Sequence, residues 1–153
     1  IVDICLAMMS APARESQIEL SASMPEALPT LRADPRAMKQ VLLNLLSNAI
    51  KFSERGGTIL VEISEQAGCV RWTIADDGIG IPGDWIDRVC DFDKHTCRDG
   101  TAGEEGTGYG LALAKRHAAL CGVAMTIESP PSSLQSRRIL RGTAIHLLVD
   151  LPR

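Results

Sequence analysis

Two asparagines and a lysine share one face of the segment 35–52. Asn44 and Asn48 are one helical turn apart, and Lys51 lies a further turn along the same face. Amide oxygens can coordinate a hard cation such as Mg²⁺, and a nearby ammonium group can hold a phosphate. Asparagine is a poor helix former, so two of them inside an apolar helix indicate a requirement beyond helix formation. On this helix alone, the alternative that each amide satisfies a nearby loop backbone carries equal weight.

A carboxylate ends the strand predicted over residues 70–76. Asp76 falls on the same face as Trp72 and Ile74, where a carboxylate is costly unless it is hydrogen-bonded. The following sequence, DGIGIP, has glycines at alternate positions, which let the backbone approach a ligand closely. An amino group on a flat heterocycle would satisfy this carboxylate. The alternative is a capped turn in which the carboxylate bonds its own loop, and this motif alone favours that alternative.

A second glycine-rich segment, GTGYGL at residues 106–111, comes directly before a predicted helix. Backbone N–H groups at a helix N-terminus favour an anion, and the helix dipole adds to this preference. The spacing is one residue shorter than that of a dinucleotide-binding fold, and the lysine of a P-loop is absent. The segment therefore predicts a phosphate-binding loop of another type.

The helix that carries the asparagines has a clear start. Asp34 can cap it and Pro35 suits its first position, while Gly56 and Gly57 predict its end after Phe52. Between these signals the apolar residues form one core-facing stripe. The stripe consists of Met38, Val41, Leu42, Leu45, Leu46 and Ala49.

The rest of the chain alternates predicted strands and helices with one long loop. The loop from Gly78 to Gly108 is glycine-rich, and a loop of this length is usually a functional lid or disordered. The lid is predicted over 83–107, with a short helix over 84–89. The pairs of strands within 58–76 and 123–151 read as hairpins, which predicts a mixed sheet with helices on one face. The other helices are predicted over 4–14, where Asp3 would be the cap, and over 110–121. The strands are predicted over 17–22, 58–65, 70–76, 123–128 and 143–151, and a further short strand is a candidate at 31–33.

Composition restricts the class of protein. The 153 residues predict a single domain, 1–153, and the net charge of −3 offers no basic face for nucleic acid. No apolar stretch approaches the roughly 20 residues that span a bilayer, and nothing reads as a signal peptide. Five cysteines without CxxC spacing favour free thiols in a reducing cytosol over zinc or disulfides. The chain begins at Ile1 rather than Met, so we expect a piece of a longer protein.

Together these segments resemble the catalytic ATP-binding domain of bacterial sensor histidine kinases. That family shares a superfamily with gyrase, the heat-shock chaperone and MutL ATPases. The matching sequences are QVLLNLLSNAIKFS at 40–53, DDGIGIP at 76–82, GTGYGLALAK at 106–115 and GTAIHLLVDLP at 142–152. The resemblance implies an α/β two-layer sandwich of the Bergerat type, with a mixed, largely antiparallel sheet and three helices on one face. It also implies ATP and Mg²⁺ as ligands and a cytoplasmic location.

The resemblance assigns roles to individual positions. Asp76 would accept a hydrogen bond from the adenine amino group, helped by a water near Thr143. Asn44 and Asn48 would hold Mg²⁺, and Lys51 is the single candidate for a catalytic group. The implied contacts to the base are Phe52, Gly78, Gly80 and Ile81, and those to the phosphates are Asn44, Asn48, Lys51, Lys94, Thr107, Gly108, Tyr109, Gly110 and Leu111.

The resemblance also bears on the reaction. Hydrolysing relatives have a glutamate where this chain has Asn44, and an amide is a poor base, so phosphoryl transfer is favoured over hydrolysis. None of His95, His117 and His146 has the family's acceptor context. The acceptor would lie on a dimerisation hairpin outside this chain, and a response regulator receiver domain would take the phosphoryl group from it.

Three departures from the family pattern keep alternatives open. The aromatic lid motif is reduced to Phe92, Glu104 and Glu105 flank the phosphate loop, and Tyr109 replaces a smaller residue. A degenerate nucleotide-binding regulatory module is therefore the alternative function. An anti-sigma-type serine kinase would share the same pocket.

Overall fold

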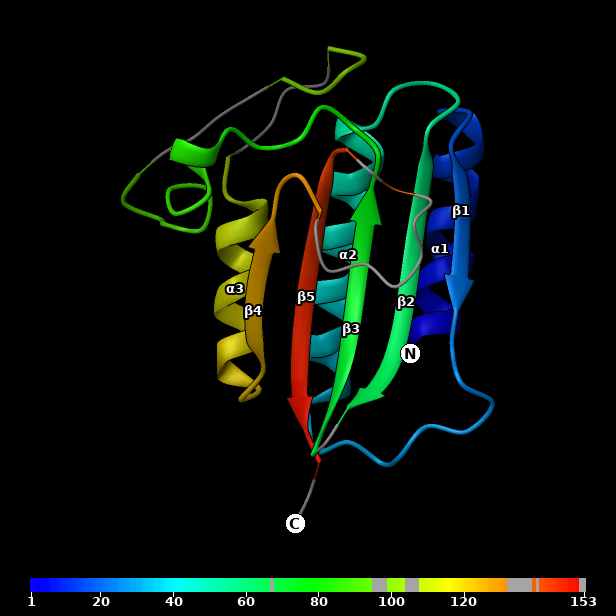
Figure 1. Cartoon of the computed structure of the whole chain (residues 1–153), viewed down its shortest axis with the longest axis vertical. Helices are drawn as coiled ribbons and strands as arrows, with labels where there is room; N and C mark the ends of the chain where they lie inside the picture. The colour runs from blue at the N-terminus through cyan, green and yellow to red at the C-terminus, as the bar shows by residue number, and fades with distance from the viewer. Residues whose placement is uncertain (67, 95–98, 104–107, 132–138, 140, 152–153) are drawn as a thin grey trace.

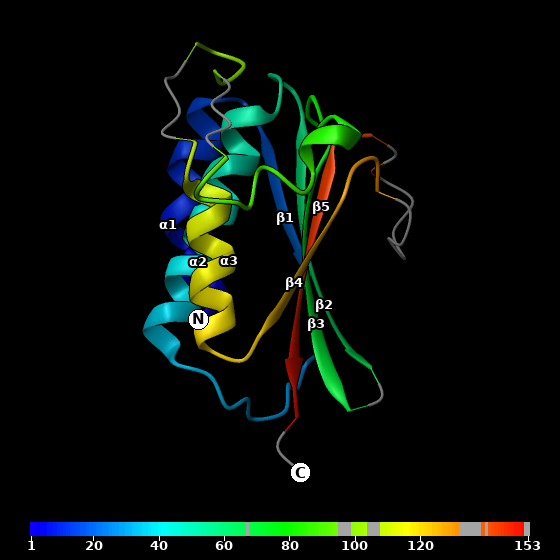
Figure 2. The same cartoon turned by 90° about the vertical axis from the view of Figure 1, so that its left-hand side faces the viewer.

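The structure, a computed structural model, describes residues 1–66, 68–94, 99–103, 108–131, 139 and 141–151. In this part of the chain, five strands form one mixed sheet and three α-helices form a second layer (Figure 1). Figure 2 shows that the three helices cover the same face of the sheet. The predicted two-layer α/β sandwich is confirmed.

The sheet has the order β1-β2-β3-β5-β4. Its strands are β1 (Glu19–Ser23), β2 (Thr58–Gln66), β3 (Cys69–Asp76), β4 (Ala124–Glu128) and β5 (Thr143–Asp150). β1 runs parallel to β2, and the other three pairings are antiparallel, so the sheet is mixed and largely antiparallel as expected. Both predicted hairpins, β2–β3 and β4–β5, are present.

The helices are α1 (Val2–Glu15), α2 (Pro35–Phe52) and α3 (Gly110–Leu120). α2 begins as its sequence predicts, because an Asp34 carboxylate oxygen accepts the Arg36 N–H at 2.8 Å. Every residue of the predicted apolar stripe on α2 is buried. These side chains meet the apolar faces of β2, β3 and β5, and the main core lies between the two layers.

Several predicted boundaries are wrong at the N-terminal end. α1 begins at Val2, with Ile1 as its N-cap and no side-chain capping bond, so Asp3 lies inside the first turn. β1 starts two residues later than predicted, because Gln17 takes a left-handed backbone with φ 58°. No strand forms at 31–33, since the cap of α2 follows immediately at Asp34.

The predicted end of α2 at Phe52 is confirmed, although Ser53 is already extended and Gly56 forms the next turn rather than the helix end. One further prediction needs correction. The helix predicted over 84–89 is a single 3-10 turn, η1 (Gly83–Trp85), followed by hydrogen-bonded turns. None of residues 83–89 is fully buried, so packing does not fix a longer helix. None of the helices in the described ranges is long and apolar enough to cross a membrane.

The sheet register brings the candidate functional segments to one end of the molecule. Asp76 at the end of β3 pairs with Thr143 at the start of β5. The Ile79 N–H donates to the Phe52 carbonyl at 3.1 Å, which ties the loop after β3 to the end of α2. The N-terminus of α3 packs against α2 at the same end (Figure 1).

Candidate functional site

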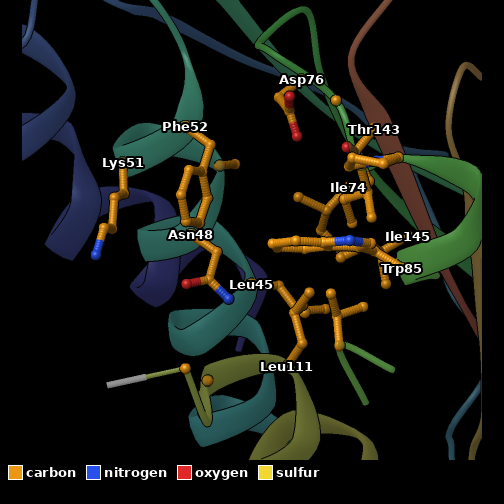
Figure 3. A pocket seen from close by; sticks show the side chains of 17 residues that line it. Leu45, Asn48, Lys51, Phe52, Ile74, Asp76, Trp85, Leu111, Thr143 and Ile145 are labelled. Carbon is orange, nitrogen blue, oxygen red and sulfur yellow. The ribbon is translucent and has the colours of Figure 1, made fainter. Parts of the chain in front are cut away.

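A cavity of about 280 Å³ lies where the ends of α2, α3, β3 and β5 meet (Figure 3). It brings together most of the predicted ATP-binding set: Asn48, Lys51, Phe52, Asp76, Gly80, Ile81, Gly108, Gly110, Leu111 and Thr143. Its remaining walls are Leu45, Ala49, Ile74, Pro82, Trp85, Val89 and Ile145, which the prediction did not include. Asn44, Gly78, Lys94 and Tyr109 do not line it, and Thr107 lies outside the described residues.

Asp76 is the buried carboxylate of this cavity. Its side chain is only 8 % exposed, and one oxygen accepts the Gly78 N–H at 3.0 Å. Burial raises the pKa of Asp76 to about 6, although hydrogen bonds from the backbone N–H groups of Gly78 and Thr143 oppose the rise. A buried acceptor of this kind gains most from a ligand that offers it a donor.

The neighbouring Asp77 has a structural role. Its carboxylate accepts the Thr58 N–H at 3.0 Å, at the start of β2. Asp77 is absent from the cavity lining. Of the two adjacent carboxylates in the motif, only Asp76 therefore faces the candidate ligand.

Close backbone packing holds Asp76 in place. A side chain at Gly142 would collide with the Asp76 carbonyl, and Gly142 also has a positive φ of 90°. A side chain at Gly78 would collide with the Phe52 carbonyl. Gly78 was predicted to line the base, but it does not line the cavity. It supports the site through its N–H, which donates to Asp76.

Ser129 is a positioning residue that sequence reasoning missed. Its hydroxyl donates to the Gly142 carbonyl at 2.7 Å and accepts the Ile81 N–H at 2.8 Å. These two bonds connect the loop after β3 to the residue before β5. A serine in the connection after β4 carries no sequence signal for this task, because both partners are distant in the chain.

The two asparagines of α2 lie in different surroundings. Asn48 lines the cavity, and its amide packs against Gly110, where a side chain would come within 3.1 Å of it. Asn44 lies one turn back, and its amide oxygen accepts a hydrogen bond from Gln40 at 3.0 Å. The buried Asn44 amide nitrogen has no hydrogen-bond partner among the described residues. Of the two, Asn48 therefore offers its amide to the cavity, beside the start of α3.

Lys51 and Phe52 form the wall at the end of α2. Figure 3 shows the Lys51 ammonium group directed away from Asp76. This group lies 5.5 Å from the centre of the Phe52 ring. A positive charge and an apolar ring therefore stand side by side at the mouth of the cavity.

The N-terminus of α3 forms the opposite side of the cavity from Asp76 (Figure 3). Gly108 has φ 72°, a conformation that favours glycine, and Tyr109 caps the helix without a side-chain hydrogen bond to it. The first N–H groups of a helix lack partners within the helix, so an anion can bind them. The Tyr109 ring points elsewhere and stacks on Phe92, with 6.0 Å between ring centres.

Lys94 does not reach the cavity in this structure. It is exposed and pairs with Asp91 at 3.7 Å. Its predicted phosphate contact would therefore require the lid segment to move.

The two histidines within the described residues do not line the cavity. His117 lies on α3, and His146 is buried on the sheet, where its ring nitrogen lies 2.9 Å from the Thr73 hydroxyl. Burial lowers the pKa of His146, although Glu128 at 3.6 Å opposes this effect. His95 lies outside the described residues.

The geometry suits a ligand with two different ends. Asp76 offers a buried acceptor to a donor on the edge of a heterocycle, and apolar side chains surround the space beside it. The N-terminus of α3 and Lys51 suit a negatively charged group at the other end. A nucleotide has both features.

Comparison with known proteins agrees with this geometry. Residues 33–153 match the family described as histidine kinase-, DNA gyrase B-, and HSP90-like ATPase. A sensor-like histidine kinase of Rhizobium meliloti strain 1021 is 38 % identical over 125 residues, which cover 82 % of this chain and 24 % of that protein. The chain spans about a quarter of the length of the first curated relatives it matches.

Solved structures show the same fold. The catalytic domain of the histidine kinase ThkA superposes with a TM-score of 0.79 at 18 % identity, covering 97 % of this chain and 90 % of that one. Full-length ShkA in complex with AMPPNP superposes with a TM-score of 0.75 at 28 % identity, covering 98 % of this chain and 29 % of that one. Because residues 33–153 match it, the chain belongs to the histidine kinase-, DNA gyrase B- and HSP90-like ATPase family.

Proposed function

We propose that this chain is the ATP-binding catalytic domain of a sensor histidine kinase. The observation that carries the proposal is the buried Asp76 carboxylate in a cavity whose opposite side is the N-terminus of α3. The complex of ShkA with AMPPNP, an ATP analogue, supports ATP as the ligand. The domain would work in the cytoplasm, where ATP is available.

In this proposal the base binds at the Asp76 end. The carboxylate accepts a hydrogen bond from the adenine amino group, and a water near Thr143 completes the recognition. Gly80, Ile81 and Phe52 pack around the base, all three from the cavity lining.

The phosphates bind at the α3 end. The N–H groups of Gly108, Tyr109, Gly110 and Leu111 cradle them, and Lys51 swings toward one of them. Thr107 and Lys94 join when the lid, proposed to extend over 83–107, closes over the nucleotide.

Mg²⁺ would bind beside the phosphates at Asn44 and Asn48. The amide chemistry fits, because Mg²⁺ takes oxygen ligands and is usually held by a few protein groups together with substrate phosphates. The Asn44 amide oxygen, which accepts from Gln40 in this structure, is the atom that would turn to the ion, while the buried amide nitrogen without a partner among the described residues is a donor that suits a phosphate oxygen. The ion would neutralise charge that develops on the phosphates during transfer.

The reaction is transfer of the γ-phosphoryl group to a histidine on a dimerisation hairpin outside this chain. The bond from the γ-phosphorus to the bridging oxygen breaks, a phosphorus–nitrogen bond forms, and ADP leaves. The amide at Asn44 supports transfer over hydrolysis because it cannot take a proton from water. A response regulator would then accept the phosphoryl group.

The test is transfer from γ-labelled ATP. We expect acid-labile label on a separately supplied hairpin that carries an acceptor histidine. We expect none on this chain by itself, because a pocket without an acceptor has nothing to position for transfer. Label on His95, His117 or His146, or ATP turnover that is equal with and without the hairpin, would contradict the proposal.

A further inference from the structure

Trp85 is a wall of the cavity that no motif accounts for. It is the last residue of η1, on the loop that leaves β3, and its side chain is half-buried. Figure 3 shows the indole edge-on among Ile74, Ile145 and Leu111, with the Phe52 ring facing it from α2. Of the five aromatic residues in the chain, Trp85 and Phe52 are the two that line the cavity.

Backbone hydrogen bonds hold the indole at this place. The Trp85 N–H donates to the Pro82 carbonyl at 2.8 Å, and the Trp85 carbonyl accepts from Arg88 and Val89 at 2.8 and 2.9 Å. The turn therefore fixes the backbone of Trp85 relative to Pro82, which also lines the cavity. The indole is thus tied to the loop that begins at Asp76.

A cation accompanies the indole. The Arg88 guanidinium lies over the ring, 5.9 Å from its centre. Attraction of the cation to the ring face helps to hold the indole in orientation, which suits it to receive a flat partner from the cavity. Trp85 is therefore arranged as a platform rather than as a loose surface side chain.

We propose that Trp85 is a specificity-determining residue whose indole stacks on the purine ring of the bound nucleotide. The inference rests on the proposed function and adds a second, independent constraint to it. Asp76 recognises a hydrogen-bond donor on the edge of the base. Trp85 recognises the flat face of the base and favours a base with a large face. Phe52 borders the base from the side of α2.

Replacement of the Trp85 indole should weaken the binding only of ligands that carry a base. Stacking of a base on an aromatic side chain, measured by alanine substitution, corresponds to about 5- to 150-fold in affinity. We expect Trp85→Ala to weaken Mg-ADP binding within that range, and Trp85→Phe to retain most of it. Binding of Mg-tripolyphosphate, which has no base, should be the same in all three proteins.

Fluorescence gives a readout that a purely structural role would not produce. The chain has two tryptophans, and Trp72 is buried on β3 outside this cavity. In the Trp72→Phe variant, Trp85 is the only tryptophan, and ADP should quench its emission while tripolyphosphate should not. In the Trp85→Phe variant, the emission of Trp72 should stay constant with either ligand.

Each outcome decides between the two levels of the proposal. If the wild-type chain binds ADP and Trp85→Ala binds it equally well, the stacking role is overturned and the proposed function stands. Tighter binding by Trp85→Ala would also overturn it, since the indole would then obstruct the base. No ADP binding by the wild-type chain would overturn both. Thermal unfolding of each variant establishes that it is folded, and Trp85→Leu repeats the test with an apolar side chain of ordinary size.

Discussion

At the scale of single residues, the buried Asp76 carboxylate lowers the stability of the fold and offers a hydrogen-bond acceptor to a ligand. The fold removes its carboxylate from water, and this burial raises its pKa to about 6. Two backbone N–H groups reduce that cost without removing it. A buried carboxylate that the fold does not fully satisfy is what a ligand donor can satisfy, and such perturbed groups are common at functional sites.

The cost leads to a prediction about stability and pH. Because the folded-state pKa is raised above its ordinary value of 3.8, the contribution of Asp76 to stability is fully present below about pH 4 and is lost as pH rises through about 6. Asp76→Asn should therefore stabilise the free domain at pH 8, by at most about 3 kcal/mol for a rise of about two pKa units. At pH 4 the gain should be absent. Urea unfolding at both pH values measures it, and an equal effect at both would contradict the burial argument.

At the scale of elements, the loop after β3 depends on a partner from the connection between β4 and β5. Ser129 bridges Ile81 and Gly142 with two hydrogen bonds, and Gly142 packs directly on Asp76. The base-binding end of the cavity is therefore shaped by three segments that are far apart in sequence. A substitution that loosens one of these segments should weaken nucleotide binding without changing the reaction.

Ser129→Ala tests this connection. Each hydrogen bond contributes about 0.5–1.5 kcal/mol, so loss of the bridge should weaken Mg-ADP binding several-fold. Ser129→Thr keeps the hydroxyl and should recover part of the affinity. The control is Ser10→Ala, which removes a hydroxyl bond to Ala7 on the exposed side of α1. Calorimetry on the three variants measures the effect, and equal affinities for Ser129→Ala and Ser10→Ala would rule out the positioning role.

The elements also show what sequence can and cannot predict here. The helix α2 was predictable because local signals agree: the cap at Asp34, the proline after it and the apolar stripe all act within one segment. The strand pairs were predictable because alternation and turn residues are local too. Ser129 and Trp85 were missed because their roles depend on contacts between distant segments, and a serine beside prolines or a tryptophan in a loop has no local pattern.

At the scale of the whole molecule, one end of the two layers carries the site and the rest supports it. The register of β3 with β5 fixes Asp76, and the packing of α3 on α2 fixes the opposite wall. The apolar core between the layers supports this frame, whereas the first N–H groups of α3 lack partners within the helix. We therefore expect ligand binding to change amide protection mainly around the cavity.

Amide hydrogen exchange with and without Mg-ADP measures this pattern. Added protection should concentrate at Gly108 to Leu111, where phosphates would occupy the N–H groups. Smaller protection is expected at Gly80 and Ile81 beside the base. β1 and α1 lie away from the cavity and should exchange at unchanged rates (Figure 1). Uniform protection across the chain, or protection that misses α3, would place the ligand elsewhere.

The most direct test of the central claim is calorimetric titration of this chain with Mg-ATP, using two neighbouring variants. Asp76→Asn turns a donor toward the adenine amino group, and an unpaired buried group costs about 1–3 kcal/mol, so affinity should fall roughly tenfold or more. Asp77→Asn removes the neighbouring charge but keeps an oxygen for the Thr58 N–H, so its affinity should change much less than that of Asp76→Asn, because Asp77 does not line the cavity. Tight binding by wild type and Asp77→Asn with a clear loss in Asp76→Asn is the expected result. Equal binding by all three proteins would contradict the assignment of Asp76, and no binding by any of them would contradict the account as a whole.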